Sequence, residues 1–127
     1  MRSGKCGTTT RTRPMTSYEF GDVVLVPFPF TDQRASKRRP AVVVSTTAYH
    51  ADHINLILMG ISSQVSASPR VGEVKVTDWK KAGLIGPSVV KAVMTTIERR
   101  MVIRKLGTLS DADRDAVALA LRLMLAQ

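Results

Sequence analysis

Residues 21–45 read GDVVLVPFPFTDQRASKRRPAVVVS, and this stretch predicts two β-strands joined by a polar, basic loop. The first run, 22–28, is rich in valine and bounded by Gly21 and Pro29, as a short strand is. Residues 28–38 are mostly polar or basic, which is typical of a loop. The run 40–45 is almost entirely apolar, so we expect its strand to be buried on both faces.

Four further runs predict strands, at 54–61, 71–77, 88–97 and 100–106. A loop that carries His50 and His53 is expected before the first of these. Residues 78–82 can form one helical turn, which Gly83 would end.

One clear helix is expected at the C-terminal end of the chain. Ser110 is a good N-cap, and Asp113 completes a capping-box-like pair with it. An apolar stripe should dock the helix on the core; its residues are Val117, Leu121, Met124 and Leu125. Six strands and one helix predict an α+β domain built on a small, curled antiparallel barrel.

The composition favours a polyanionic partner. The 127 residues carry a net charge of +9, with 19 basic and 10 acidic side chains. Residues 1–17 hold four of the basic residues and no acid, and we expect them to form a disordered basic extension before a single domain at 18–127. The lone cysteine, Cys6, allows no internal disulfide, and the sequence has neither an apolar leader nor a membrane span of ~18 apolar residues. A cytoplasmic location is therefore expected.

The usual catalytic constellations are not present. The glycines stand apart, so none of them forms a phosphate-binding loop, and no Cys/His set has metal-ligand spacing. His50, Asp52 and His53 lack a further strong ligand, which favours a solvent-exposed pair of histidines over a metal site. No Ser-His-Asp arrangement is specified. We expect no metal and no cofactor.

Several motifs in order resemble the MazF/PemK family of toxins from type II toxin–antitoxin systems. Gly21-Asp22 opens the first strand, and Arg39-Pro40 begins the second. The later matches are 58–63 (LMGISS), 82–84 (AGL) with 87–89 (PSV), 96–98 (TIE) and 106–110 (LGTLS). The resemblance covers residues 18–126.

This resemblance implies an SH3-like barrel of the PemK/CcdB type, a homodimer and a metal-independent endoribonuclease that is specific for sequences in single-stranded RNA. The substrate's own 2′-hydroxyl attacks the phosphate, which leaves 2′,3′-cyclic phosphate and 5′-hydroxyl ends. Two catalytic positions carry over, onto Arg39 and Ser62. A cognate antitoxin with an acidic tail is the implied protein partner.

The two residue types suit this chemistry. A guanidinium binds a phosphate through two hydrogen bonds, and Pro40 biases Arg39 toward extended backbone. The hydroxyl of Ser62 can donate to the phosphate while its oxygen accepts elsewhere. Neighbouring residues are candidates for RNA contacts: Phe30, Thr31, Lys37, Arg38, Ser63 and Gln64. A basic run such as 37–39 is otherwise most often a solvated face.

Two other functions stay open. A non-enzymatic toxin of the CcdB kind would act on DNA gyrase through a helix ending in Trp-Gly-Ile, whereas this sequence ends Leu125-Ala126-Gln127. A barrel that binds RNA without cutting it is the third reading. The family often has a carboxylate and an arginine in the strand at Lys91–Thr95, where this chain has no acid.

Overall fold

The computed structural model describes residues 17–27, 38–65 and 68–126. In this part of the chain the strands are β1 (Asp22–Pro27), β2 (Arg38–Val43), β3 (Asn55–Ser62), β4 (Val74–Val76), β5 (Ser88–Glu98) and β6 (Arg104–Thr108). The helices are α1 (Thr47–Asp52), the 3-10 turn η2 (Arg99–Met101) and α2 (Asp111–Met124). Of the predicted extension at 1–17, only Ser17 lies within the described residues, where it is exposed.

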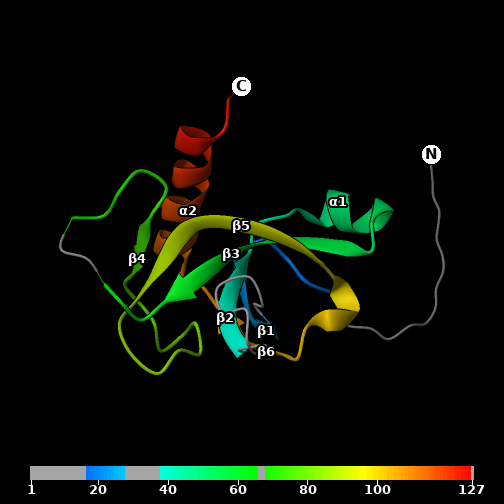
Figure 1. Cartoon of the computed structure of the whole chain (residues 1–127), viewed down its shortest axis with the longest axis horizontal. Coiled ribbons are helices and arrows are strands. Elements are labelled where there is room, and N and C mark those ends of the chain that lie inside the picture. The colour runs from blue at the N-terminus through cyan, green and yellow to red at the C-terminus, as the bar shows by residue number, and fades with distance from the viewer. Residues whose placement is uncertain (1–16, 28–37, 66–67, 127) are drawn as a thin grey trace.

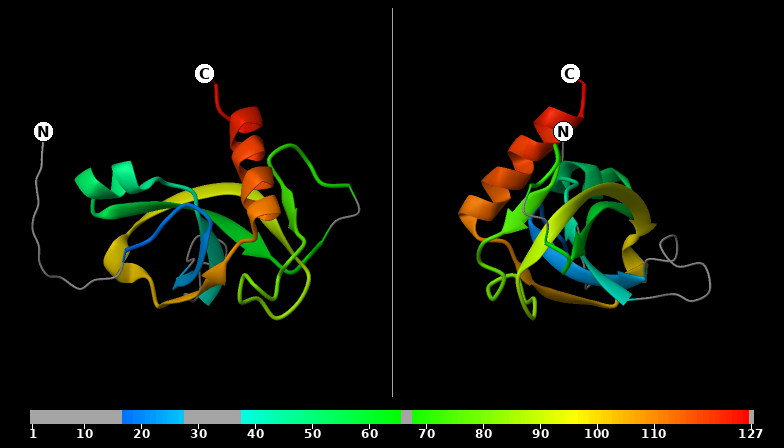
Figure 2. Two further views of the ribbon diagram at one scale, coloured as in Figure 1. Left: turned by 180° about the vertical axis from the view of Figure 1, so that it is seen from behind. Right: turned by 60° about the vertical axis from the view of Figure 1, so that its left-hand side comes forward.

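The strands form one curled antiparallel sheet with the order β4-β5-β3-β2-β1-β6. The long strand β5 arches across the molecule, and α2 stands against the sheet on the side of β4 (Figure 1). Figure 2 shows the sheet curling round without joining β4 to β6, so the barrel is open. The predicted α+β fold, a small SH3-like antiparallel barrel with a C-terminal helix, is confirmed.

Apolar side chains fill both faces of the sheet because β-strands alternate their side chains. On β1, Val23 belongs to the cluster that packs under α2, whereas Val24 and Val26 belong to the cluster on the opposite face. Ala41, Val42 and Val43 are all fully buried, so the predicted burial of the second strand on both faces is confirmed.

Helix α2 begins where the sequence predicts, but Asp113 acts differently. The Ser110 hydroxyl accepts the Asp113 N–H at 3.2 Å, which is half of a capping box. The buried carboxylate of Asp113 instead accepts hydrogen bonds from the Thr77 N–H and hydroxyl and from the Asp78 N–H, at 2.8–3.1 Å. Asp113 therefore ties the start of α2 to the chain leaving β4.

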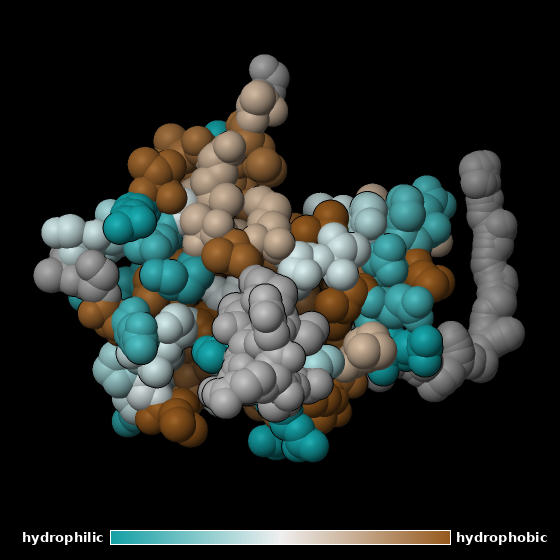
Figure 3. Space-filling view, in the orientation of Figure 1, coloured by the Kyte–Doolittle hydropathy of each residue, from teal (hydrophilic) through white to brown (hydrophobic). Residues whose placement is uncertain are grey.

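The predicted docking stripe of α2 is correct except at its end. Val117 is fully buried, and Leu121 and Met124 pack against the same cluster. Leu125 ends the helix and is half exposed, as are Leu119 and Leu123. Figure 3 shows this apolar surface around the C-terminal end of the chain. In the described part of the chain, no helix is both long and apolar enough to cross a membrane.

The sequence prediction of a strand at 100–106 is wrong in its first half. Residues 99–101 form η2, and the strand begins only at Arg104. Farther along, the register of β6 against β1 shifts by one residue between Val23 and Val24, because Gly107 pairs with Val23 while Lys105 pairs with Val24. Leu106 is the extra residue of this β-bulge.

The predicted loop before β3 contains a helix, α1, and His50 is not a free surface residue. Its Nδ1 lies 2.9 Å from the Tyr18 carbonyl oxygen, and its Nε2 lies 2.6 Å from the Ser45 hydroxyl. A carbonyl can only accept, so Nδ1 carries the proton and Nε2 accepts from Ser45. His53 stacks on Tyr49 with ring centroids 4.1 Å apart. The reading of these histidines as a solvent-exposed loop pair is therefore wrong for His50.

This arrangement predicts a loss of stability in mild acid. Burial, the largest cause, and the positive charge of Arg99 lower the pKa of His50 from 6.5, although the Tyr18 carbonyl and Asp22 oppose this. Below pH 6.5 the unfolded chain therefore binds more protons than the folded one, and the free energy of unfolding falls. Urea unfolding at pH 7 and at about pH 5.5 should show this fall in the wild type and a smaller one in His50→Gln. Equal falls in both proteins would show that His50 is not responsible.

Candidate active site

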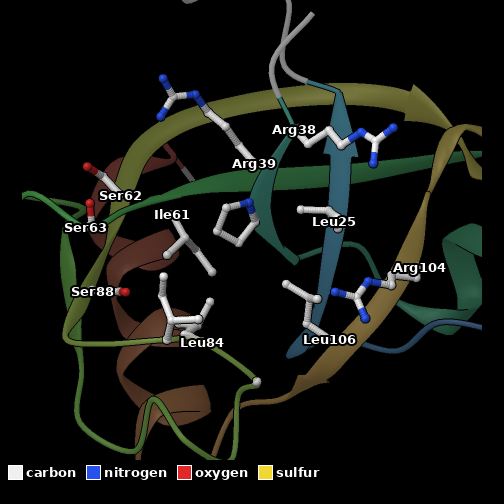
Figure 4. A pocket seen from close by; sticks show the side chains of 13 residues that line it. Leu25, Arg38, Arg39, Ile61, Ser62, Ser63, Leu84, Ser88, Arg104 and Leu106 are labelled. Atoms are coloured by element: carbon white, nitrogen blue, oxygen red, sulfur yellow. The ribbon is translucent and has the colours of Figure 1, made fainter.

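The register of the sheet brings Arg39 and Ser62 together. Ala41 pairs with Gly60 and Val42 with Met59, and the same register continued by two residues places Arg39 opposite Ser62. Opposed residues of antiparallel strands project from the same face. Figure 4 shows both side chains along the same side of a cleft.

The cleft has a volume of about 490 Å³ and lies where β2 begins and β3 ends. Its lining includes Arg38, Arg39, Arg104, Ser62, Ser63 and Ser88, with an apolar wall of Leu25, Pro40, Ile61, Leu84, Ile85 and Leu106. Among the described residues, those lining the cleft include no carboxylate, imidazole or thiol. Arginines without counter-charges favour an anionic ligand.

Arg39 keeps an unused donor inside the protein. Its Nε atom is buried and has no hydrogen-bond partner within the described part of the chain. An unsatisfied buried donor costs about 1–3 kcal/mol, and such atoms are rare in folded proteins. Among the described residues, the protein supplies no acceptor for this donor.

Ser62 is held by the turn that follows β3. Its Oγ accepts the Gln64 N–H at 3.0 Å, which fixes the oxygen and leaves the hydroxyl proton free to be donated. Ser88, also on the lining, has already committed its hydroxyl to the Gly86 carbonyl at 2.9 Å. Ser62 is therefore better placed than Ser88 to donate to a ligand.

The wall opposite Ser62 depends on close backbone packing. A Cβ on Gly83, whose φ is +79°, would lie 2.1 Å from the Leu106 carbonyl oxygen, and one on Gly107 would lie 2.5 Å from that of Lys81. These two glycines let the turn at 78–84 sit directly on β6. The bulge at Leu106 lies at the same place, where Leu84 and Leu106 line the cleft.

The structure places the residues predicted for the site in three groups. Arg38, Arg39, Ser62 and Ser63 line one cleft, whereas Gln64 does not and contributes its backbone N–H to Ser62. Phe30, Thr31 and Lys37 lie outside the described residues.

Arg104 and the apolar wall are absent from the sequence prediction. The spacing of Arg104 and Leu106 indicates that both side chains lie on one face of β6. The sequence does not show that this face borders the cleft, because that depends on the pairing of β6 with β1.

Strand β5 has no carboxylate of its own at Lys91–Thr95, but a carboxylate from a neighbouring segment contacts it there. Lys91 on β5 forms an ion pair with Glu73, just before β4, with 2.9 Å between Nζ and Oε2. The hydrogen bond from Lys91 lowers the pKa of Glu73. Neither residue lines the cleft. Among the described residues, no three His, Cys, Asp or Glu side chains are grouped as they are around a metal ion.

Solved structures share this fold. The Mycobacterium tuberculosis toxin MazF-mt6 is 23% identical, with a TM-score of 0.63 over 79% of this chain and 91% of that one. A mycobacterial endoribonuclease in complex with its cognate antitoxin is 14% identical, with a TM-score of 0.67 over 87% and 99% of the two chains. Another mycobacterial endoribonuclease is 16% identical, with a TM-score of 0.62 over 88% and 98%. No curated protein matches the chain.

A curled antiparallel sheet with a C-terminal helix is thus the fold of MazF-type toxins. The model of the PemK-like, MazF-like toxins of type II toxin–antitoxin systems matches residues 19–125. The chain belongs to this toxin family.

Proposed function

We propose that this toxin is a metal-independent, sequence-specific endoribonuclease that cuts single-stranded RNA at the Arg39–Ser62 end of the cleft. The 2′-hydroxyl loses its proton as its oxygen bonds to phosphorus, and the bond from phosphorus to the 5′-oxygen breaks. The leaving 5′-oxygen takes up a proton. The products are a 2′,3′-cyclic phosphate and a 5′-hydroxyl.

The observation that carries this proposal is that the guanidinium of Arg39 and the hydroxyl of Ser62 line one cleft that has no carboxylate among its described residues. Attack on phosphorus builds negative charge on the non-bridging oxygens, and fixed donors aimed at them lower the barrier. The guanidinium of Arg39 keeps its charge when partly buried and can offer two parallel N–H groups. The hydroxyl of Ser62 can add a third donor, since its oxygen is held by Gln64.

The proposal is tested with one sequence made as RNA and as DNA. The protein should cut the RNA and leave the DNA whole, because DNA has no 2′-hydroxyl. Ser62→Ala should lower the cleavage rate constant roughly 100-fold, the effect of losing one fixed donor. Ser62→Thr keeps the hydroxyl and should retain most of the activity. Cleavage of the DNA, or a fully active Ser62→Ala protein, would contradict the proposal.

We propose two protein partners as well. The mycobacterial structural relative is bound to its cognate antitoxin, and an acidic, disordered tail of such a protein fits a cleft lined by arginines. Saturating cognate antitoxin should therefore suppress cleavage, and an unchanged rate would rule out this role. A second copy of the chain is the other partner, and a monomeric mass by light scattering at micromolar concentration would rule it out.

A further inference from the structure

The two basic residues at the start of β6 have opposite surroundings. Lys105 Nζ lies 3.3 Å from the carboxylate of Asp22, whose side chain is almost buried. The charge of Lys105 is therefore neutralised within the protein. Arg104 is exposed and lines the cleft. Within residues 17–27, 38–65 and 68–126, Arg104 forms no ion pair or hydrogen bond. Its charge is therefore free for a ligand.

Arg104 lies across the cleft from the Arg39–Ser62 pair. Arg104 pairs with Leu25, and Leu25 pairs with Pro40, so these three residues share one face of the sheet. Arg39 pairs with Val26 and so starts from the other face, but it stands at the end of β2, where its side chain lines the same cleft. Neighbouring strands are about 4.8 Å apart, which puts the backbone of Arg104 roughly 10 Å from that of Pro40. Figure 4 shows Arg104 on the side of β6, with Leu25 between it and Ser62.

This spacing fits an extended polyanion better than a single phosphate. A strand whose scissile phosphate lies at Arg39 and Ser62 carries one further charge on every nucleotide. Leu25 and Leu106 offer an apolar surface between the two cationic positions, where a ribose or base would lie. A guanidinium with no partner among the described residues can bind a phosphate through two hydrogen bonds.

We propose that Arg104 binds a phosphate next to the scissile one, so that the cleft is a two-phosphate site. The proposal rests on the proposed ribonuclease function. Arg104 is a positioning residue here: it fixes where along the strand the cut falls and does not touch the reacting phosphorus. The charge on Arg104 adds to substrate binding, and its main effect is on KM.

The first test compares Arg104→Ala with Arg122→Ala, which removes an equal charge from an exposed position on α2 away from the cleft. Arg104→Ala should raise KM roughly tenfold, with a much smaller change in kcat. The plot of log(1/KM) against log salt concentration should become less steep by about 0.7, the value for one phosphate contact with a single strand. Arg122→Ala should alter neither KM nor the slope.

The second test assigns the phosphate. Neutral methylphosphonates are placed one at a time beside the cut site. One of them should weaken substrate binding to the wild type but not to Arg104→Ala, because the charge it removes has lost its partner. Equal losses in both proteins at every position would overturn the proposal. So would an Arg104→Ala protein whose only defect is weaker inhibition by poly-L-glutamate, since that assigns Arg104 to an acidic protein ligand.

The two proposals fail in different ways. A wild type that cuts no RNA refutes the proposed function, whereas a wild type that cuts RNA with KM unaffected by Arg104→Ala refutes only the role of Arg104. Binding of a 2′-deoxy oligonucleotide, followed by fluorescence anisotropy at several salt concentrations, reports on Arg104 in either case. An unchanged salt dependence in Arg104→Ala would overturn the two-phosphate site.

Discussion

Replacing Arg39 with alanine is expected to lower the rate constant for RNA cleavage about 100- to 1,000-fold without weakening the fold. We expect the activity to fall because the proposed mechanism places this guanidinium beside the scissile phosphate. The fold does not suffer, since the Nε atom is a buried donor without a partner in the described part of the chain. Removing it ends a desolvation cost of about 1–3 kcal/mol. Single-turnover kinetics and urea unfolding measure the two effects.

Two variants sharpen this experiment. Arg39→Lys keeps the charge but loses the planar pair of N–H groups, so we expect its rate constant to lie between those of the wild type and Arg39→Ala. Arg122→Ala removes a positive charge outside the cleft and should be fully active. An Arg39→Ala protein that is folded and cuts RNA at the wild-type rate would remove Arg39 from the site.

Replacing Asp113 with alanine is expected to lower the free energy of unfolding by about 3 kcal/mol. Burial works against ionisation of this carboxyl, but the hydrogen bonds from Asp78 and Thr77 hold its pKa below the ordinary value. Alanine would leave the N–H groups of both residues without their acceptor. Those residues begin the turn at 78–84 that carries Leu84 to the cleft, so cleavage should fall as well.

Asp115→Ala is the matched control, because Asp115 is an exposed acid on the same helix. Its unfolding free energy should change by less than about 0.5 kcal/mol. The stability that Asp113 contributes is present above its unfolded pKa of 3.8 and is lost as the pH falls through the lower folded value. Similar urea midpoints for the Asp113 and Asp115 variants would show that the carboxylate does not hold α2 to the chain after β4.

The sequence predicts much of the fold because hydrophobic patterns report burial directly. The run at 41–43 is entirely apolar and is buried on both faces, and Ser110 caps α2 as its position suggests. Patterns do not report where a chain bends. Residues 100–106 look like a continuous strand, yet η2 occupies Arg99–Met101, where the chain turns back from β5 toward β6.

Long-range contacts account for the other differences. The helix α1 is held by a network from His50 to Ser45 and Tyr18, which lie 5 and 32 residues away along the chain. The carboxylate of Asp113 likewise finds its partners 35 and 36 residues away, and so does not close the capping box. Neither contact has a local sequence signature.

Some residues of the candidate site could be predicted from the sequence, and others depend on how the strands pair. Arg39 and Ser62 stand in motifs that resemble those of the family, and the strand register then accounts for their proximity. Arg104 stands in no such motif and reaches the cleft only because β6 pairs with β1. The arginines that line the cleft repel one another in the absence of a ligand, which is a cost that proteins commonly accept at functional sites.

The chemistry at the cut is the central claim, and the ends of the products test it most directly. The purified protein is incubated with a mixed-sequence single-stranded RNA in excess EDTA, and the fragments are analysed by mass spectrometry. We expect discrete fragments that end in a 2′,3′-cyclic phosphate on one side of each cut and a 5′-hydroxyl on the other. Fragments with 3′-hydroxyl and 5′-phosphate ends, or cleavage that stops in EDTA, would contradict attack by the 2′-hydroxyl at Arg39 and Ser62.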